Sequence, residues 1–234
     1  MSRRIILNKR KYNGIDKKNN DNDISKIITD NLFDNLINKK QKKGCGDDSS
    51  DNEDVYREYN HIYFRSDVSI QSIDNLLKCI REFEEEMSDM KSDPYSKYFT
   101  HPELYIHITT YGGDLYASLM AYDVLKSKTY TVVTIAEGYV ASGGTIMMIG
   151  GKKRQIQKSA LMLIHQLSTH IYGKFEEIKD DFNNSEQDMK RLTNIYHTEL
   201  KGKMTKKQIE DALKHDSWWD AKTCITNGLC DEIL

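Results

Sequence analysis

The sequence predicts an α/β fold, in which a mostly parallel β-sheet is covered by helices. Strand-like and helix-like segments alternate through most of the chain. Short apolar runs rich in β-branched residues, such as Tyr130–Ile135, are typical of buried strands. Repeated strand–helix units usually join parallel strands through crossover helices that pack on the sheet.

The elements can be taken in chain order. His61–Arg65 predicts a strand, and Ile70–Met87 predicts a helix because its apolar residues recur at helical spacing. Residues 88–102 contain both prolines and predict a loop. The next predicted elements are a strand from Leu104 to a Gly-Gly turn, a helix over Leu115–Lys126, the strand Tyr130–Ile135, a buried helix over Thr145–Ile149, and strands around Gln155 and Leu163.

A long helix is predicted over Lys174–Leu200, which contains few helix breakers. Its apolar positions include Phe175, Ile178, Phe182, Met189, Leu192 and Ile195, and its other face is highly charged. A helix of this length in a small domain is expected to project from the domain or to pack on another subunit.

Composition divides the chain into residues 1–55 and residues 56–234. Asn, Asp and Lys dominate the first part, which predicts a polar, flexible extension. Within it, a short amphipathic helix is predicted from Ile24, Ile27, Ile28, Leu32, Leu36 and Ile37. This helix could lie lightly on its own domain, or it could dock on the core or a partner. Residues 56–234 have the length of one domain.

Charge, hydropathy and cysteine spacing exclude several classes of function. The net charge is −2, with 34 basic and 36 acidic residues, which gives no electrostatic case for binding nucleic acid. No apolar run approaches the roughly 20 residues that span a bilayer. The four cysteines form no CxxC pair and have no histidine at ligand spacing. We therefore expect reduced thiols, no metal or cofactor, and a cytoplasmic location. An import leader at residues 2–10 is the alternative, and the acidic residues that follow argue against it.

The segment Gly138–Ile149 contains a candidate nucleophile, Ser142. This serine lies between a predicted strand and a small, apolar helix start, near free backbone N–H groups and a positive helix end. Such a setting suits a nucleophile whose attack creates an oxyanion. The two glycines after Ser142 leave room for a substrate backbone. An ordinary tight turn explains the same residues equally well.

Three further segments supply possible partners for Ser142. His165 ends the apolar strand Leu161–Ile164 and could turn toward a neighbouring loop, although a satisfied core or surface histidine is the commoner case. Asp216 precedes Trp218 and Trp219, which could desolvate and orient it; the alternative is a helix N-cap. Gly112-Gly113 could point a backbone N–H into a cleft, or could form a plain strand–helix turn.

In this order the four segments resemble the proteolytic subunit of the Clp protease, the ClpP family of serine peptidases. The matching motifs are Gly112-Gly113, Ala141-Ser142-Gly143-Gly144, Ile164-His165-Gln166 and Asp216 before its two tryptophans; the resemblance covers about Tyr56 to Leu234. It implies that Ser142 is the nucleophile, His165 the general base and acid, and Asp216 the orienting carboxylate. The backbone N–H groups of Gly113 and Gly143 would form the oxyanion hole.

The resemblance also implies a fold and an assembly. The fold would be the ClpP/crotonase-like superhelix of ββα units, with Lys174–Leu200 as a projecting handle helix. Two heptameric rings of the same chain would stack through these helices into a tetradecamer that encloses the active sites. An ATP-dependent AAA+ unfoldase would feed unfolded polypeptides into this chamber. This chain has no G-x-x-x-x-G-K-[ST] loop, so ATP chemistry would belong to the partner.

The chain departs from the family pattern at four positions. After Gln166 the family usually has a proline, where this chain has Leu167-Ser168, and after the nucleophile it usually has a methionine, where this chain has Gly143. Before the Gly-Gly turn the family usually has Ser-Pro, and this chain has Thr110-Tyr111. After the acid the family usually has an arginine, and this chain has Ser217. These changes leave the triad intact and affect the expected substrate preference. Two alternatives stay open: a catalytically silent or regulatory ClpP-like subunit, and a crotonase-type acyl-CoA enzyme, which shares the fold and a two-N–H oxyanion hole.

Overall fold

The computed structural model describes residues 54–91 and 103–234. The extension predicted for residues 1–55 lies outside the described residues except for its last two positions, and so does its amphipathic helix. Most of the loop predicted for residues 88–102 also lies outside them.

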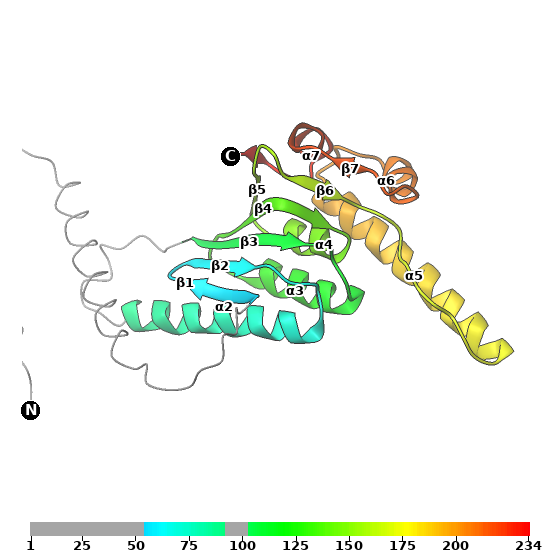
Figure 1. Cartoon of the computed structure of the whole chain (residues 1–234), viewed down its shortest axis with the longest axis horizontal. Helices are drawn as coiled ribbons and strands as arrows, with labels where there is room; N and C mark the ends of the chain where they lie inside the picture. The colour runs from blue at the N-terminus through cyan, green and yellow to red at the C-terminus, as the bar shows by residue number, and fades with distance from the viewer. Residues whose placement is uncertain (1–53, 92–102) are drawn as a thin grey trace, which may run out of the picture. The chain divides into compact units, whose positions relative to one another are not determined.

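The described chain alternates strands and helices as the sequence predicts. In order, the elements are β1 (Val55–Glu58), β2 (His61–Phe64), α2 (Ile70–Lys91), β3 (Leu104–Thr110), α3 (Leu115–Ser127), β4 (Val132–Ala141), α4 (Gly143–Ile149), β5 (Lys153–Ile156), β6 (Leu161–Leu163), α5 (Phe175–Glu199), α6 (Lys206–Leu213), β7 (Trp218–Trp219), α7 (Ala221–Asn227) and β8 (Glu232–Ile233) (Figure 1).

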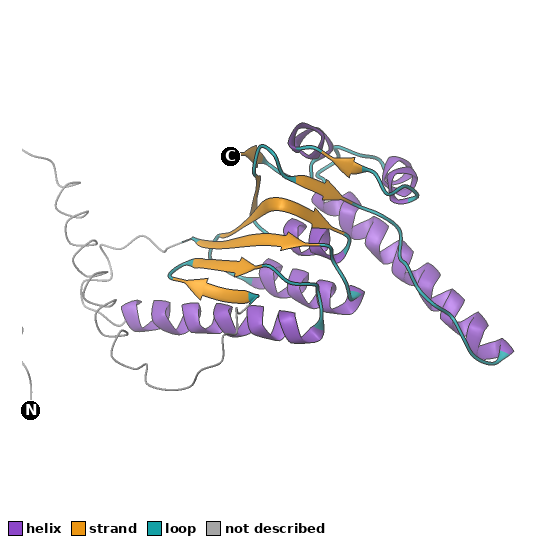
Figure 2. Cartoon of the chain, viewed as in Figure 1, coloured by secondary structure: helices purple, strands orange, loops and turns teal. Residues whose placement is uncertain are grey.

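One sheet connects all of these strands, in the order β1-β2-β3-β4-β5-β8, and β6 and β7 branch from β4. All pairings are parallel except β1 with β2 and β6 with β7. Figure 2 shows helices along one side of this sheet and a long helix that runs away from one end of it. The predicted α/β class with a mostly parallel sheet is confirmed.

Strand β4 carries the branch point of the sheet. Its first half pairs with β5 over Val133–Ala136, and its last three residues, Tyr139–Ala141, pair with β6. Gly138 lies between the two halves and has a φ of 62°, which glycine adopts at little cost. The strand therefore continues six residues beyond the predicted end at Ile135 and delivers Ser142 beside β6.

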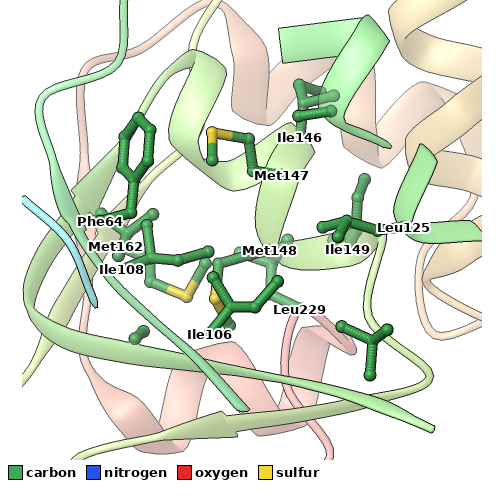
Figure 3. Packing of buried hydrophobic residues seen from close by; sticks show 14 of the residues in the cluster. Phe64, Ile106, Ile108, Leu125, Ile146, Met147, Met148, Ile149, Met162 and Leu229 are labelled. Atoms are coloured by element: carbon green, nitrogen blue, oxygen red, sulfur yellow. The ribbon is translucent and has the colours of Figure 1, made fainter. Parts of the chain in front are cut away.

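The core lies between the sheet and helices α2, α3 and α4. Burial alternates along β3, where Leu104, Ile106 and Ile108 are fully buried on the face toward the helices. Figure 3 shows this packing, with Ile106 and Ile108 near Met148 of α4. Every residue of α4 is buried, so the helix that begins next to Ser142 is held on all sides.

Helix α5 is buried at one end and exposed at the other. Leu192 and Tyr196 near its C-terminal end are buried, whereas Phe175, Ile178 and Phe182 near its N-terminal end are exposed apolar residues. Figure 1 shows this N-terminal end extending away from the sheet. The predicted projecting helix is present. None of the described helices combines the length and hydropathy that a membrane span requires.

The C-terminal segment is fastened to the sheet by Arg154 of β5. The Arg154 side chain is 2% exposed. Its Nε and Nη2 donate to the two carboxylate oxygens of Asp231 at 3.0 and 2.6 Å. Its Nη1 donates to the backbone carbonyl of Glu199, at 2.9 Å. One buried guanidinium therefore connects β5, the end of α5 and the segment before β8.

We expect Asp231→Asn to destabilise the protein at neutral pH but not in acid. Burial alone would raise the pKa of Asp231, but hydrogen bonds and the charge of Arg154, with a contribution from Lys201, hold this pKa below its ordinary value of 3.8. A carboxyl group whose pKa is lowered by folding stabilises the folded state above its unfolded pKa, and the contribution disappears as the pH falls through the folded pKa.

Thermal unfolding of the wild type and Asp231→Asn across this pH range checks the expectation. The free energies of unfolding should differ by about 1 kcal/mol at neutral pH, because solvent screens the partly exposed carboxylate. They should converge below pH 3.8. Asp211→Asn is the control, since Asp211 pairs with Lys214 at the surface and should change stability little at any pH. A difference for Asp231→Asn that persists in acid would contradict the expectation.

Candidate active site

Ser142 occupies a strained turn between β4 and α4. Its φ is 52° and its ψ −125°, a conformation that non-glycine residues rarely adopt. Its backbone N–H donates to the Leu163 carbonyl at 2.9 Å. Its carbonyl accepts from the Thr145 N–H at 2.9 Å and from Thr145 Oγ1 at 2.6 Å. The Ser142 side chain makes no capping hydrogen bond to α4, so its hydroxyl is not used as an ordinary N-cap.

The Gly-Gly turn after β3 packs directly against the Ser142 turn. Gly112 has a φ of 97° and Gly113 a φ of 147°. A Cβ on Gly112 would lie 2.5 Å from Ser142 Cβ and 2.8 Å from the Gly143 nitrogen. A Cβ on Gly143 would lie 3.5 Å from the Gly113 nitrogen. Only glycine at position 112 allows the two turns to come this close, and their contact brings the backbone N–H groups of Gly113 and Gly143 together.

The Gly-Gly turn is fixed on its other side by Val68. The Val68 N–H donates to the Gly112 carbonyl at 2.7 Å, and the Asp114 N–H donates to the Val68 carbonyl at 2.8 Å. Inside the turn, the Gly112 N–H donates to Thr110 Oγ1 at 3.0 Å. None of these three bonds uses the Gly113 N–H. The turn is thus held by backbone bonds with Val68 and by the Thr110 hydroxyl, and none of these contacts uses the Gly113 N–H.

Strand pairing brings His165 and Asp216 to the same place. Parallel pairing aligns Leu163 of β6 with Ala141 of β4, so His165 follows β6 near the point where Ser142 follows β4. Antiparallel pairing aligns Leu163 with Trp218 of β7, so Asp216 approaches His165. The two side chains are separated by 3.7 Å between His165 Nδ1 and Asp216 Oδ1. This distance is longer than a hydrogen bond.

Two interpretations of Asp216 are wrong in detail. Its side chain is 82% exposed, and Trp218 is also exposed, so the aromatic residues do not desolvate it. It is not a helix N-cap either, because strand β7 rather than a helix follows it. The Asp216 position is set by the pairing of β7 with β6, at an open edge of the sheet.

A cavity of about 500 Å³ lies over the Ser142 turn. Gly113, Ser142, Gly143 and His165 line it together, with the extended segment 166–171 and residues of α5 forming further walls. Asp216 is not part of the lining. The structure therefore collects four of the five predicted site residues around one cavity and leaves the fifth beside His165.

Comparison with known proteins identifies the family of this chain. The family model for Clp protease matches residues 98–234, more than half of the chain. The chain belongs to the Clp protease family. The chain is 30% identical over 136 residues to the ATP-dependent Clp protease proteolytic subunit 3 of Streptomyces avermitilis. It is 29% identical over 134 residues to subunit 1 of Streptomyces coelicolor.

These matches have limited extent. Each of the two covers 56% of this chain, and the chain spans 60% of the length of each relative. Among solved structures, a ClpP1 point mutant from Listeria monocytogenes superposes with a TM-score of 0.63 at 17% identity, over 75% of this chain and 91% of that one. At this identity the likeness shows the fold, which confirms the predicted ClpP/crotonase-like architecture.

The glycine that replaces the usual methionine of Clp proteases has a structural reason in this chain. A Cβ on Gly143 would lie 2.2 Å from Ser118 Oγ of α3. Ser118 is fully buried, and its hydroxyl donates to the Asp114 carbonyl at 2.7 Å. Gly143 and Ser118 therefore fit each other, and a side chain at 143 would displace the Ser118 hydroxyl from its bond to Asp114.

Two residues at this candidate site were not found by sequence reasoning. Thr145 contacts the Ser142 carbonyl, and the buried Tyr196 of α5 contacts Thr145. Thr145 carries a local signal, because it lies three residues after Ser142, at the first turn of α4. Tyr196 carries none, because its role depends on how α5 packs against α4 across 51 positions of sequence.

Proposed function

We propose that this member of the Clp protease family is a serine endopeptidase that uses Ser142 as its nucleophile. The observation that carries the proposal is the strained Ser142 turn, which packs against the Gly-Gly turn and faces a cavity shared with His165. Strain of this kind costs about 1–3 kcal/mol and is concentrated at active sites.

In the proposed reaction, Ser142 Oγ attacks the carbonyl carbon of a peptide bond while His165 removes its proton. The Gly113 and Gly143 N–H groups donate to the oxyanion that forms. The C–N bond then breaks, and the leaving amine takes the proton from His165. Water, activated by the same imidazole, hydrolyses the acyl-enzyme and regenerates Ser142.

Asp216 is proposed to orient the His165 ring and to stabilise its protonated form. The 3.7 Å separation requires a small approach of the carboxylate, which its exposed position permits. Catalytic hydrogen bonds are often long in ligand-free proteins and shorten when substrate binds.

The proposed substrates are unfolded polypeptides, cleaved inside an oligomeric chamber. The support lies in α5, whose exposed Phe175, Ile178 and Phe182 form an apolar surface suited to a second copy of the chain. Heptameric rings that stack into a tetradecamer, an AAA+ unfoldase partner and a cytoplasmic site of action belong to the same proposal. The two Streptomyces relatives are proteolytic subunits of ATP-dependent Clp proteases by name.

The lining of the cavity speaks against an acyl-CoA substrate. Among the described residues that line it, Asp114, Asp181 and Asp188 are acidic, and none is lysine or arginine. Coenzyme A carries several phosphate charges, which a lining of this sign would repel. A catalytically silent subunit is compatible with any cavity lining, so this alternative must be tested by the reactivity of Ser142.

We expect a fluorophosphonate probe to label Ser142 in the wild-type protein and not in His165→Ala, because the hydroxyl needs a base to become nucleophilic. Peptide mapping by mass spectrometry identifies the labelled residue. His170→Ala is the matched control, since His170 lines the same cavity outside the proposed triad and its loss should leave labelling intact. Unlabelled wild-type protein would favour a silent subunit, and labelling at another serine would contradict the assignment of Ser142.

A further inference from the structure

Helix α5 reaches the Ser142 turn through a buried pair of hydroxyl groups. Tyr196 of α5 is 3% exposed and Thr145 of α4 is fully buried. The Tyr196 Oη lies 2.6 Å from Thr145 Oγ1. Thr145 Oγ1 in turn lies 2.6 Å from the Ser142 carbonyl oxygen. A continuous chain of two short hydrogen bonds therefore joins α5 to the backbone of Ser142.

The direction of both bonds follows from the groups involved. A carbonyl oxygen only accepts, so the single Thr145 hydroxyl proton must point to the Ser142 carbonyl. The Tyr196 hydroxyl must then donate to Thr145 Oγ1. Burial raises the pKa of Tyr196 above its ordinary value, which keeps this donor protonated. Each hydroxyl is thus paired. The hydrogen bond that the Thr145 hydroxyl accepts from Tyr196 polarises it, and this strengthens the bond that Thr145 donates to the Ser142 carbonyl.

The contact acts on the one residue of the site whose backbone is strained. A positive φ at a non-glycine residue persists only when its surroundings fix it. β6 fixes the Ser142 N–H through the Leu163 carbonyl, and α4 fixes the Ser142 carbonyl through Thr145. Tyr196 holds the Thr145 hydroxyl in the rotamer that makes this second bond.

We propose that Tyr196 and Thr145 are positioning residues for Ser142, so that the packing of α5 sets the alignment of the nucleophile. This inference rests on the proposed function of Ser142. Neither hydroxyl touches the substrate in this account; both act through the Ser142 backbone. The consequence is that the helix with the exposed apolar end also controls the reactivity of the serine.

Removing the Tyr196 hydroxyl should slow the reaction while leaving substrate binding nearly unchanged. In Tyr196→Phe the ring still fills its site, but Thr145 Oγ1 loses its donor and can rotate away from the Ser142 carbonyl. We expect kcat for peptide hydrolysis and the rate of fluorophosphonate labelling to fall by roughly 10- to 100-fold, as for other small misplacements of reacting groups. KM should change little.

Four variants separate positioning from stability. Thr145→Val removes the same contact and should match Tyr196→Phe, and the double variant should be no slower than Thr145→Val because both act through one chain of bonds. Thr145→Ser keeps the hydroxyl and should retain most of the labelling rate. Tyr122→Phe is the control, since the Tyr122 hydroxyl also joins α3 to α5, by donating to Glu199 at 2.7 Å, away from Ser142. It should lower the melting temperature without changing the labelling rate of the folded protein.

A second readout keeps the two proposals distinguishable. Hydrogen exchange of the amides of residues 142–149 reports the Ser142 turn whether or not the serine reacts. Faster exchange there in Tyr196→Phe but not in Tyr122→Phe would support the inference. This holds even if the wild-type protein is not labelled, because that result would overturn only the proposed function. If hydrogen exchange is unchanged in Tyr196→Phe, or if this variant is labelled at the wild-type rate, the inference is overturned and the proposed function is unaffected.

Discussion

Ser142→Ala is expected to abolish peptide hydrolysis while the protein stays folded. The substitution removes the oxygen that attacks the carbonyl, and loss of a serine nucleophile lowers kcat by roughly 10⁶-fold in a well-studied serine protease. Alanine needs the same positive φ as serine, so the cost of the strained turn is unchanged. The turn is fixed by three hydrogen bonds to the Ser142 backbone, two from backbone groups and one from the Thr145 hydroxyl, and none involves the removed hydroxyl.

The measurement is hydrolysis of a fluorogenic peptide and of an unfolded protein, with thermal unfolding and sedimentation as checks on fold and assembly. The melting temperature and sedimentation coefficient should match those of the wild type. Hydrolysis by the variant within tenfold of the wild-type rate would show that Ser142 is not the nucleophile, because removal of the nucleophile should lower kcat far more than tenfold. If the variant loses both hydrolysis and its melting transition, unfolding rather than loss of the nucleophile explains the lost activity.

Gly112→Ala is expected to disable the site and to destabilise the whole domain. Two penalties act together at this position. The φ of 97° is unfavourable for alanine, and the added Cβ would lie 2.5 Å from Ser142 Cβ and 2.7 Å from the Ala141 carbonyl oxygen. Two of its three nearest contacts are backbone atoms, which cannot rotate aside as a flexible side chain could. Overpacking a rigid site costs about 1–3 kcal/mol, and the alanine backbone conformation adds about 1–2 kcal/mol.

Gly202→Ala separates these two penalties. Gly202 also has a positive φ, of 77°, but a Cβ there would have no atom within 4 Å. It should therefore show the backbone cost alone and should keep its fluorophosphonate labelling. Gly112→Ala should unfold at a clearly lower temperature than Gly202→Ala and should not label. Equal stability and full labelling in both variants would show that the two turns do not depend on their close contact.

The sequence was sufficient where structure follows from local pattern. The alternation of apolar and polar residues in Leu104–Thr110 determines which face of β3 is buried, and the structure has that face. Ser142 could be placed at a strand–helix junction because both neighbours are recognisable over a few residues. The same locality explains the error in bounds: the β-branched run ends at Ile135, where the strand was predicted to end, whereas β4 continues through Gly138 to Ala141.

Features that depend on distant pairing could not be predicted in this way. The exposure of Asp216 follows from the antiparallel pairing of β7 with β6, and β7 contains only Trp218 and Trp219. The contact of Gly112 with Ser142 depends on how two separate turns pack. The bond between Tyr196 and Thr145 depends on where α5 crosses α4, which no pattern in either segment encodes.

The branching of the sheet at β4 has a consequence for the order of folding. Strand β6 joins only the end of β4, and β7 joins only β6, so His165 and Asp216 reach Ser142 through two successive pairings. Contacts between distant segments form slowly, because loop-closure entropy must be spent before they form. The β6–β7 pairing joins Met162 to Trp219, 57 positions apart in the chain. We therefore expect this pairing to form late, and the proposed catalytic site to stay incomplete until β7 has paired with β6.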